Sequence, residues 1–271
     1  MVITLTTDWG DDYFTGMLKG IIMRYLPDVS IIDLARNIPP YSITQAAFAV
    51  RNAYHCFPEG SIHILGVNNE YSEKTPHVAA FYRNHYFLGT ANGIFDLIFE
   101  TPPDKAVCIT RFKKMEMPTF SVLSTFVPAA VHIAKNLPLE KLGGIYDMRL
   151  NNSSLSPIHD AFSITGVVIY IDSFGNIVTN ITRASFEEKC NGRDFVISVL
   201  SRHNSINRIS LRYSDVNVGD MVAVFNSMDM LEIAVNNGSL AEMLGLTLNT
   251  HVYIKFSSTP DPVSGTLFDA L

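Results

Sequence analysis

Short apolar runs alternate with segments of helical spacing through the first half of the chain, and this alternation restricts the fold more than any other feature of the sequence. Val2 to Leu5 predicts a buried strand, Tyr13 to Tyr25 a helix, and Val29 to Leu34 a second strand. Ile43 to Tyr54 has the apolar spacing of another helix, and Ser61 to Val67 predicts another buried strand. This order of elements is typical of an α/β fold with a central, largely parallel sheet.

The second half of the chain has a different rhythm, which predicts a separate and smaller domain. A helix over Pro128 to Lys135 closes the α/β part, and residues 151–157 have the polar, proline-containing composition of a linker. The strand-like runs that follow are Gly166 to Ile171, Phe195 to Leu200, Ile206 to Leu211, Met221 to Phe225 and Val252 to Phe256. Such a series is typical of an all-β barrel or sandwich. We therefore expect an α/β domain over residues 1–150, a linker over 151–164 and a smaller, barrel-like β domain over 165–271.

The composition indicates a small-molecule ligand rather than a polymer or a membrane. The formal net charge of the 271 residues is −6 and the lysines and arginines are scattered, so neither nucleic acid nor an anionic membrane is an expected partner. Met1 to Leu5 runs straight into polar residues and predicts neither a signal peptide nor a spanning helix. Cys56, Cys108 and Cys190 are widely separated and lack metal-ligand spacing, which favours core thiols in a reducing, cytoplasmic compartment.

The first polar cluster, Thr6 to Asp12, comes directly after the first predicted strand. Ligands of open α/β sheets bind outside the carboxyl ends of the strands. At such a position Asp8 could accept both hydroxyls of a ribose, and several aspartates together could hold a hard cation. Asp11 and Asp12 have a simpler alternative role, as caps of the following helix.

Two further clusters lie in the predicted β domain. Asp172 to Asn176 places an aromatic ring and an amide beside a carboxylate, groups that suit an adenine face, a base or hydroxyl edge and an amine. The same segment also predicts an ordinary hairpin turn. Asn226 to Met228 and Leu231 to Ser239 form the third cluster, whose alternative interpretation is a strand followed by a helix capped near Ser239.

Sequence motifs for several other chemistries are missing. The eight histidines show no zinc-binding spacing, and the chain has no dinucleotide-binding glycine fingerprint, P-loop or serine-hydrolase elbow. We therefore expect no metal site and no cofactor other than the ligand or substrate itself.

Segments spread in order along most of the chain resemble the family of SAM hydrolases (SAM hydroxide adenosyltransferases), fluorinases and chlorinases. They are Thr7–Gly10 with Met17–Gly20, Pro27–Leu34, Ile38–Tyr41, Phe57–Gly60, Ala91–Gly93, Asp172–Asn176 with Thr179–Ile181, and Glu232–Gly238. The resemblance implies a pocket for S-adenosylmethionine (SAM) or adenosine, formed between the α/β domain and the β domain of a neighbouring subunit in a homotrimer.

The resemblance also implies roles for individual residues. Asp8 would bind the ribose hydroxyls, and Asp172 and Ser227 would hold the amine and the carboxylate of the methionine part. These assignments suit the chemistry, because a carboxylate attracts an ammonium and a hydroxyl donates to a carboxylate. The rest of the implied ligand-binding set is Phe174, Asn176 and Tyr213 around the adenosine, Val235 and Asn236 at the adenine edge, and Asn68 and Glu232.

The reaction implied by the family is in-line displacement of methionine from C5′ of the ribose by water, or by a halide in the specialised members. A sulfonium needs no general acid to leave, so the reaction depends on alignment and desolvation of the nucleophile. The water-activating Asp, Arg and His of the family correspond here to Asn68, the region of Lys74, and Ser121. The Tyr and the halide-contacting Ser of fluorinases correspond to Asn68 and Val122. Because an amide orients water but does not take its proton at neutral pH, we expect weak, adenosine-forming hydrolysis with Asn68 and Ser121 at the catalytic positions.

Two alternatives remain open from the sequence. One is a SAM or adenosine binder that has lost catalysis together with the water-activating residues. The other is a calcium-dependent nucleoside hydrolase, because Thr6 to Asp12 resembles the metal motif of that family, although Thr6 replaces its first aspartate and the spacing is one residue short.

Overall fold

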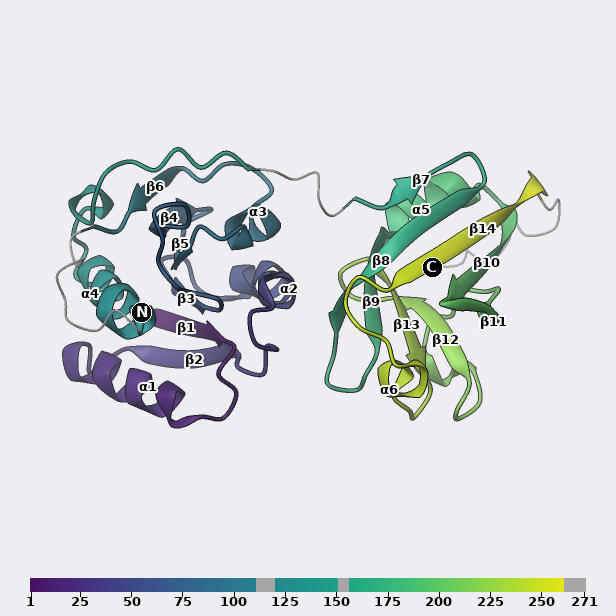
Figure 1. The fold of residues 1–271 in the computed structure, drawn as a ribbon, viewed down its shortest axis with the longest axis horizontal. Helices are drawn as coiled ribbons and strands as arrows, with labels where there is room; N and C mark the ends of the chain where they lie inside the picture. The colour runs from purple at the N-terminus through teal and green to yellow at the C-terminus, as the bar shows by residue number, and fades with distance from the viewer. Residues whose placement is uncertain (111–119, 151–155, 261–271) are drawn as a thin grey trace. The chain divides into compact units, whose positions relative to one another are not determined.

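The computed structural model describes residues 1–110, 120–150 and 156–260, which form two compact units. The units divide at Met1–Asn152 and Ser153–Leu271. The first is an α/β unit and the second is an antiparallel, nearly closed barrel (Figure 1). The predicted fold class is therefore confirmed, and each unit is described by itself below.

The α/β unit is built on a mixed sheet with the strand order β2-β1-β3-β5-β4-β6. Its strands are β1 Val2–Thr7, β2 Ser30–Ala35, β3 Ile62–Gly66, β4 His77–Tyr82, β5 His85–Thr90 and β6 Lys105–Cys108. Strands β2, β1, β3 and β5 are parallel neighbours, whereas β4 pairs antiparallel with both β5 and β6. Because the first four strands are parallel, their carboxyl ends meet at one edge of the sheet.

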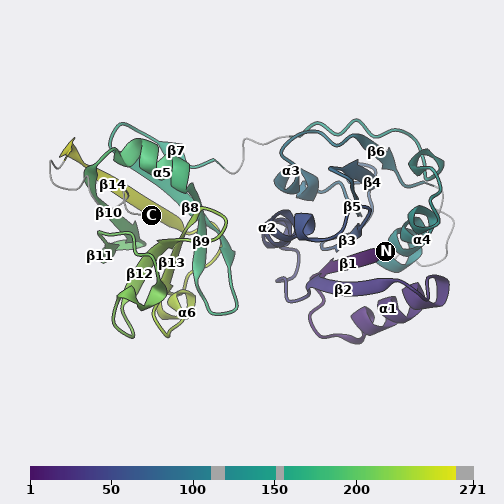
Figure 2. The same ribbon diagram turned by 180° about the vertical axis from the view of Figure 1, so that it is seen from behind.

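Helices cover both faces of this sheet, as Figures 1 and 2 show: α1 and α4 lie on one face, α2 and α3 on the other. The helices are α1 Tyr13–Tyr25, α2 Ile43–Ala53, α3 Ile94–Ile98 and α4 Val127–Ala134, with shorter turns at Tyr54–Cys56, Val122–Phe126 and Leu139–Lys141. Alternate side chains of β3 enter the two cores, since Ile62 and Ile64 pack in the cluster of α1 and α4 while Leu65 packs in that of α2 and α3. This two-sided burial explains why β3 is apolar along its whole length.

The second unit is an antiparallel sheet with the order β11-β10-β14-β8-β9-β13-β12, to which β7 adds by pairing with β8. Its strands are β7 Ile158–His159, β8 Ser163–Ile171, β9 Ile177–Thr182, β10 Arg193–Val199, β11 Ser201–Ile206, β12 Met221–Phe225, β13 Met230–Val235 and β14 His251–Pro260. Helices α5 Arg183–Cys190 and α6 Leu240–Leu244 lie at opposite ends of the unit (Figure 2). The interior holds side chains of every strand from β8 to β14, among them Ile164, Ile233 and Ile254.

The strand expected at Ile206 to Leu211 is wrong. Strand β11 ends at Ile206, and within the following segment only Ser210 forms an isolated bridge, to Val224. The carboxylate of Asp215 accepts hydrogen bonds from the backbone N–H groups of Leu211 and Arg212, which draws the chain into the short 3-10 helix Tyr213–Asp215. A side chain acceptor thus overrides the strand-forming tendency of the apolar residues.

The segment expected as a linker, 151–164, contains β7 and the first residues of β8. Its first part, 151–155, lies outside the described residues. The polar composition that predicted a linker therefore continues into a paired strand.

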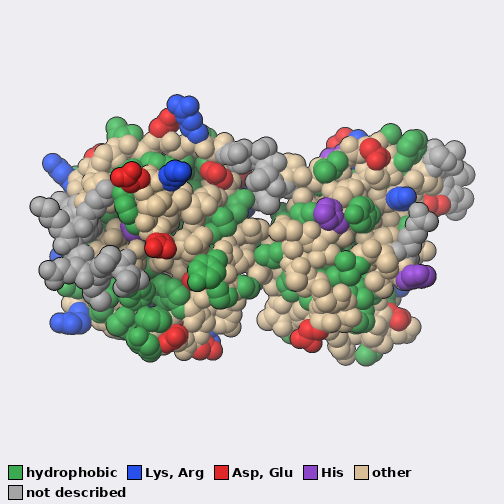
Figure 3. Space-filling view, in the orientation of Figure 1, with side chains coloured by type: hydrophobic (Ala, Val, Ile, Leu, Met, Phe, Trp, Pro, Cys, Tyr) green, Lys and Arg blue, Asp and Glu red, His purple; other side chains and the backbone are tan. Residues whose placement is uncertain are grey.

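Several charged side chains of the surface form ion pairs, among them Lys105 with Glu140 and Arg51 with Glu100. On the face shown in Figure 3, the Lys, Arg, Asp and Glu side chains are dispersed over both units rather than gathered into one basic patch. Among the described residues, no helix has the length and apolar character needed to cross a membrane.

Candidate functional site

Asp8 links the segments that follow three strands at the carboxyl edge of the α/β sheet. It follows β1, and its Oδ2 accepts hydrogen bonds from the backbone N–H groups of Tyr41 (2.9 Å) and Asn68 (3.3 Å). Tyr41 lies beyond β2 and Asn68 lies directly beyond β3. Both donors, Tyr41 and Asn68, have positive φ angles, 65° and 44°. Non-glycine residues adopt this conformation rarely, and it is found often at functional sites. The structure thus fixes a carboxylate where open α/β sheets bind ligands.

The loop that carries Asn68 is held by two side chains that the sequence did not assign to the site. Nδ2 of Asn92 donates to the carbonyl oxygen of Asn68 (2.7 Å), and Nε2 of His77 donates to that of Asn69 (3.1 Å). Asn92 lies in the family-like segment Ala91–Gly93, so a signal for it existed, whereas His77 had none because it stands alone in sequence. Both residues position the loop.

Ser121 begins a tight turn that packs against the same edge. It is 6% exposed and precedes the π-helical turn Val122–Phe126, a distortion that is frequent at functional sites. A Cβ atom on Gly66 would lie 3.2 Å from the side chains of both Trp9 and Val122, so the two side chains pack closely against this glycine. The ring of Trp9 also meets that of Phe120, with centroids 5.1 Å apart. These contacts bring the segments of Asp8, Asn68 and Ser121 together, while Lys74 is exposed in its loop.

Six buried side-chain polar atoms in this unit have no hydrogen-bond partner among the described residues, and three of them lie near the carboxyl ends of strands: Oγ1 of Thr6, Oγ1 of Thr90 and Nδ2 of Asn69. Thr90 ends β5 and is paired with His77 across the β4–β5 ladder. A buried hydroxyl without a partner costs about 1–3 kcal/mol, so these atoms are places where water or a ligand would stabilise the protein.

Asp12 has the capping role that was the simpler alternative for both aspartates, whereas Asp11 forms a surface ion pair instead. Oδ1 of Asp12 accepts from the backbone N–H of Tyr13 (2.6 Å) at the start of α1, and Asp11 lies 3.4 Å from Arg36 in an exposed ion pair. Within the ranges that the structure describes, no three His, Cys, Asp or Glu side chains are grouped as metal ligands would be.

In the barrel unit, Asp172 organises the turn between β8 and β9. Its Oδ1 accepts from the backbone N–H groups of Phe174 and Asn176, and its Oδ2 accepts from Nδ2 of Asn176, each at 2.9 Å. Gly175 has φ +79°, and a Cβ there would lie 2.0 Å from Oγ of Ser239. The predicted hairpin turn is confirmed, and it leaves the ring of Phe174 74% exposed. Two hydrogen bonds therefore join Asn176 to the carboxylate of Asp172.

Glu232 is a buried carboxylate at the centre of a second polar group. It is 5% exposed, and its two oxygens accept from the hydroxyl of Tyr213 (2.6 Å) and from Nδ2 of Asn226 (3.1 Å). Its β13 neighbours Leu231 and Ile233 point into the barrel core, so Glu232 points outward, toward the segment of Tyr213. Burial, followed by Glu232 and then the charge of Asp172, raises the pKa of Tyr213 above its ordinary value.

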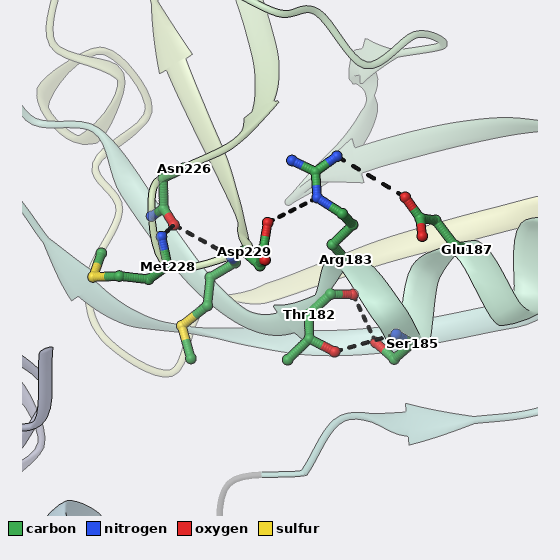
Figure 4. Close-up of polar contacts among 8 residues, drawn as sticks. Thr182, Arg183, Ser185, Glu187, Asn226, Met228 and Asp229 are labelled. Atoms are coloured by element: carbon green, nitrogen blue, oxygen red, sulfur yellow. Dashed lines mark hydrogen bonds and ion pairs between the residues drawn. The ribbon is translucent and has the colours of Figure 1, made fainter. Parts of the chain in front are cut away.

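Ser227 lies exposed in the turn between β12 and β13. Figure 4 shows the polar contacts of the neighbouring turn residues Asn226 and Asp229. Oδ1 of Asn226 accepts from the backbone N–H groups of Met228 (3.0 Å) and Met230 (3.2 Å). Oδ1 of Asp229 accepts a hydrogen bond from Nε of Arg183, the first residue of α5, at 2.8 Å. The hydroxyl of Ser227 is thus presented by a turn of defined geometry.

The far end of β13 carries Val235 and Asn236. Nδ2 of Asn236 donates to the carbonyl oxygen of Val216 (2.9 Å), and the carbonyl of buried Val235 accepts from the N–H of Gly238 (3.1 Å). Ser239 caps α6 through the N–H of Glu242, as its alternative interpretation predicted. Strand β13 and its turns therefore bring Asn226, Ser227, Glu232, Val235 and Asn236 onto one element.

Comparison with known proteins accounts for both units. The model of the SAM hydroxide adenosyltransferase N-terminal domain matches residues 3–143, and that of the C-terminal domain matches residues 166–253. The chain belongs to the SAM hydroxide adenosyltransferase family. The resemblance seen in the sequence segments is thereby confirmed.

Members of this family with curated names cover nearly the whole chain. The (R)-S-adenosyl-L-methionine hydrolase of Thermus thermophilus is 30% identical over 252 residues, which are 89% of this chain and 94% of that protein. The fluorinase of Actinopolyspora mzabensis is 22% identical over 278 residues, covering 89% of this chain and 92% of its own. A solved structure, an uncharacterized conserved protein from Thermotoga maritima, superposes with a TM-score of 0.82 at 24% identity, over 94% of this chain and 100% of that one, and shows the shared fold.

Proposed function

We propose that this member of the SAM hydroxide adenosyltransferase family hydrolyses S-adenosyl-L-methionine at C5′ of the ribose to give adenosine and L-methionine. The observation that carries the proposal is the similarity to the Thermus thermophilus hydrolase, which extends through both units of the chain. The more distant match to a fluorinase is consistent with the same substrate and a different nucleophile.

The proposed ligand contacts use the groups whose geometry is described above. Asp8 accepts from the ribose hydroxyls, and its carboxylate is already oriented by the backbone of Tyr41 and Asn68. Asp172 and Ser227 hold the amine and the carboxylate of methionine. The adenosine contacts are Phe174, Asn176, Tyr213, Val235 and Asn236, while Asn68 and Glu232 complete the set.

Water is the proposed nucleophile, and it is oriented rather than deprotonated by the protein. Asn68 supplies an amide and Ser121 a hydroxyl, and neither takes a proton at neutral pH. Water attacks C5′, the C–S bond breaks with its electrons passing to sulfur, and the surplus proton leaves to solvent. General-base assistance contributes about two to four orders of magnitude, so the rate should be low.

A chromatographic assay of SAM, run with both sulfonium epimers and with and without chloride and fluoride, tests the proposal. We expect adenosine and methionine above the spontaneous background, and no 5′-halo-adenosine. Asn68→Asp with Ser121→His should raise the rate, since the pair restores a proton acceptor and its partner; Asn136→Asp, an exposed change of the same chemistry, should leave it unchanged. Background rates for both the natural chain and the double variant, with SAM bound intact, would instead identify a binder.

We also propose that the chain works as a homotrimer in the cytoplasm, without a metal or other cofactor. Analogy with the family supports the trimer, because it would complete each pocket with the barrel unit of a neighbour. Light scattering at micromolar concentration should return three times the monomer mass; a monomer mass would contradict the assembly but leave the hydrolysis assay standing. Chelation with EDTA should leave turnover unchanged, whereas calcium-dependent release of ribose would indicate a nucleoside hydrolase.

A further inference from the structure

The hydrogen bonds around Glu232 fix the direction in which the Tyr213 hydroxyl points. A tyrosine hydroxyl can donate one hydrogen bond and also accept, so its use toward a ligand depends on where its hydrogen already goes. Here the hydroxyl oxygen lies 2.6 Å from Oε1 of Glu232. That distance is typical of an O–H donating to an ionised carboxylate and is shorter than most neutral O–H···O bonds.

The second oxygen of Glu232 is also committed as an acceptor, because the orientation of Asn226 is set independently. Oδ1 of Asn226 accepts from the backbone N–H groups of Met228 and Met230, so its amide nitrogen must face the other way. That nitrogen donates to Oε2 of Glu232 at 3.1 Å. Glu232, itself 5% exposed, therefore accepts a hydrogen bond at each of its two oxygens.

We infer that Glu232 makes Tyr213 an acceptor-only contact, so that the adenosine part of the ligand is recognised there through one of its own N–H or O–H groups. This inference rests on the proposed function for the place of adenosine beside Tyr213. The candidate donors are the N6 amino group and the ribose hydroxyls; a ring nitrogen of adenine, which only accepts, is excluded from this contact. Glu232 acts as a specificity-determining residue through Tyr213 and need not touch the ligand.

Glu232→Gln reverses this polarity without changing the size of the side chain. The Gln oxygen must face the donor of Asn226, so its NH₂ group faces Tyr213 and donates to the phenol oxygen. The Tyr213 hydrogen is then released from its internal partner and points elsewhere. A ligand donor facing that oxygen meets a competing donor or a turned hydroxyl, and its hydrogen bond is lost.

The first test needs no ligand. Tyrosine labelled with ¹³C at Cζ is followed by NMR from pH 8 to 12 in the full chain, with Tyr213→Phe used to assign the Tyr213 signal. We expect Tyr213 to stay protonated to higher pH in the natural protein than in Glu232→Gln. Asp172, the other acid that acts on Tyr213, is present in both proteins and serves as a constant background. Identical titration in the two proteins would refute the assigned direction of the bond.

The second test measures binding by calorimetry with adenosine, purine riboside and the 2′-, 3′- and 5′-deoxy forms of adenosine. Glu232→Gln should weaken adenosine about 10-fold, and the loss should vanish for the one analogue that lacks the donor facing Tyr213. In the Tyr213→Phe background, Glu232→Gln should have no further effect. Unchanged adenosine affinity, or an equal loss for every analogue, would overturn the inference. Absence of adenosine binding by the natural protein would count against the proposed function instead, while the NMR titration would still decide the polarity.

Discussion

Mild acid should destabilise the α/β unit through one buried histidine. His63, the second residue of β3, is 0% exposed and its Nδ1 lies 2.7 Å from Oγ1 of Thr4. Its Nε2 lies 3.2 Å from Nδ1 of His85, a second buried imidazole. Burial, and secondarily the neighbouring His85, lower the pKa of His63 from 6.5 to about 3. His63 is therefore neutral in the folded protein at every pH at which the protein is normally handled.

The direction of the pH effect on stability follows from the proton bound by His63 in the folded and in the unfolded chain. Below pH 6.5 the unfolded chain binds a proton at His63 and the folded chain does not, so the free energy of unfolding falls as the pH falls and levels off only near pH 3. Each pH unit in this window costs about 1.36 kcal/mol, so His63 alone should remove about 2 kcal/mol between pH 7 and pH 5. That is a large part of a total stability of about 5–15 kcal/mol.

Urea unfolding followed by tryptophan fluorescence measures this loss of stability. The signal reports on the α/β unit, because the single tryptophan, Trp9, packs against the core of that unit. His63→Gln removes the titrating group and keeps hydrogen-bonding capacity, so it should be less stable at pH 7 but lose about 2 kcal/mol less than the natural protein on going to pH 5. His159→Gln, at an exposed position, is the matched control. Equal losses for the natural protein and His63→Gln would show that burial of this imidazole does not govern the acid response.

Other positions give predictions that are independent of the first. Asp8→Asn should weaken adenosine binding about 10- to 100-fold in calorimetry, because a charged acceptor is lost; unchanged affinity would remove Asp8 from the ligand site. Thr90→Val should raise the urea-derived free energy of unfolding by about 1 kcal/mol, because Oγ1 of Thr90 is buried without a partner among the described residues, and a decrease would reveal a bound water instead. Gly175→Ala should destabilise the barrel unit by about 1–3 kcal/mol, since its Cβ would meet Ser239; Gly192→Ala, at a similar positive φ but with open space around it, should cost less, and equal melting temperatures would contradict the steric argument.

Local patterns in the sequence were sufficient for the elements whose residues face a single, uniform environment. Helix α1 begins and ends where its apolar spacing predicted, and β12 has the predicted bounds. The turn at Asp172 to Asn176 was also predictable, because its hydrogen bonds run between residues at most four apart. The family could be recognised for a related reason, since its motifs are short and keep their order along the chain.

Local patterns failed where a distant partner decides the structure. The segment after Ile206 is apolar enough for a strand, but Asp215 draws it into a turn. The sequence analysis did not predict the hairpin of β4 and β5. Its strands also pair with β3 and β6, and these pairings join segments that are separate in the sequence. His77 has no neighbour in sequence that marks it, and its contact with the carbonyl oxygen of Asn69, eight residues earlier, is seen only in the folded chain.

The sequence by itself determined that the chain is an α/β unit followed by a β unit and that it belongs with the SAM hydrolases and fluorinases, and it led to the hypothesis that Asn68 and Ser121 stand where water activation is expected. Those properties reside in residue order, which periodicity and motifs record directly. Only the tertiary structure decided that Asp8 accepts hydrogen bonds from the residues after β2 and β3, and that Glu232 accepts the hydrogen bond of the Tyr213 hydroxyl. Hydrogen-bond direction and burial depend on groups that come together from positions far apart in the chain, and no pattern within a single segment contains them.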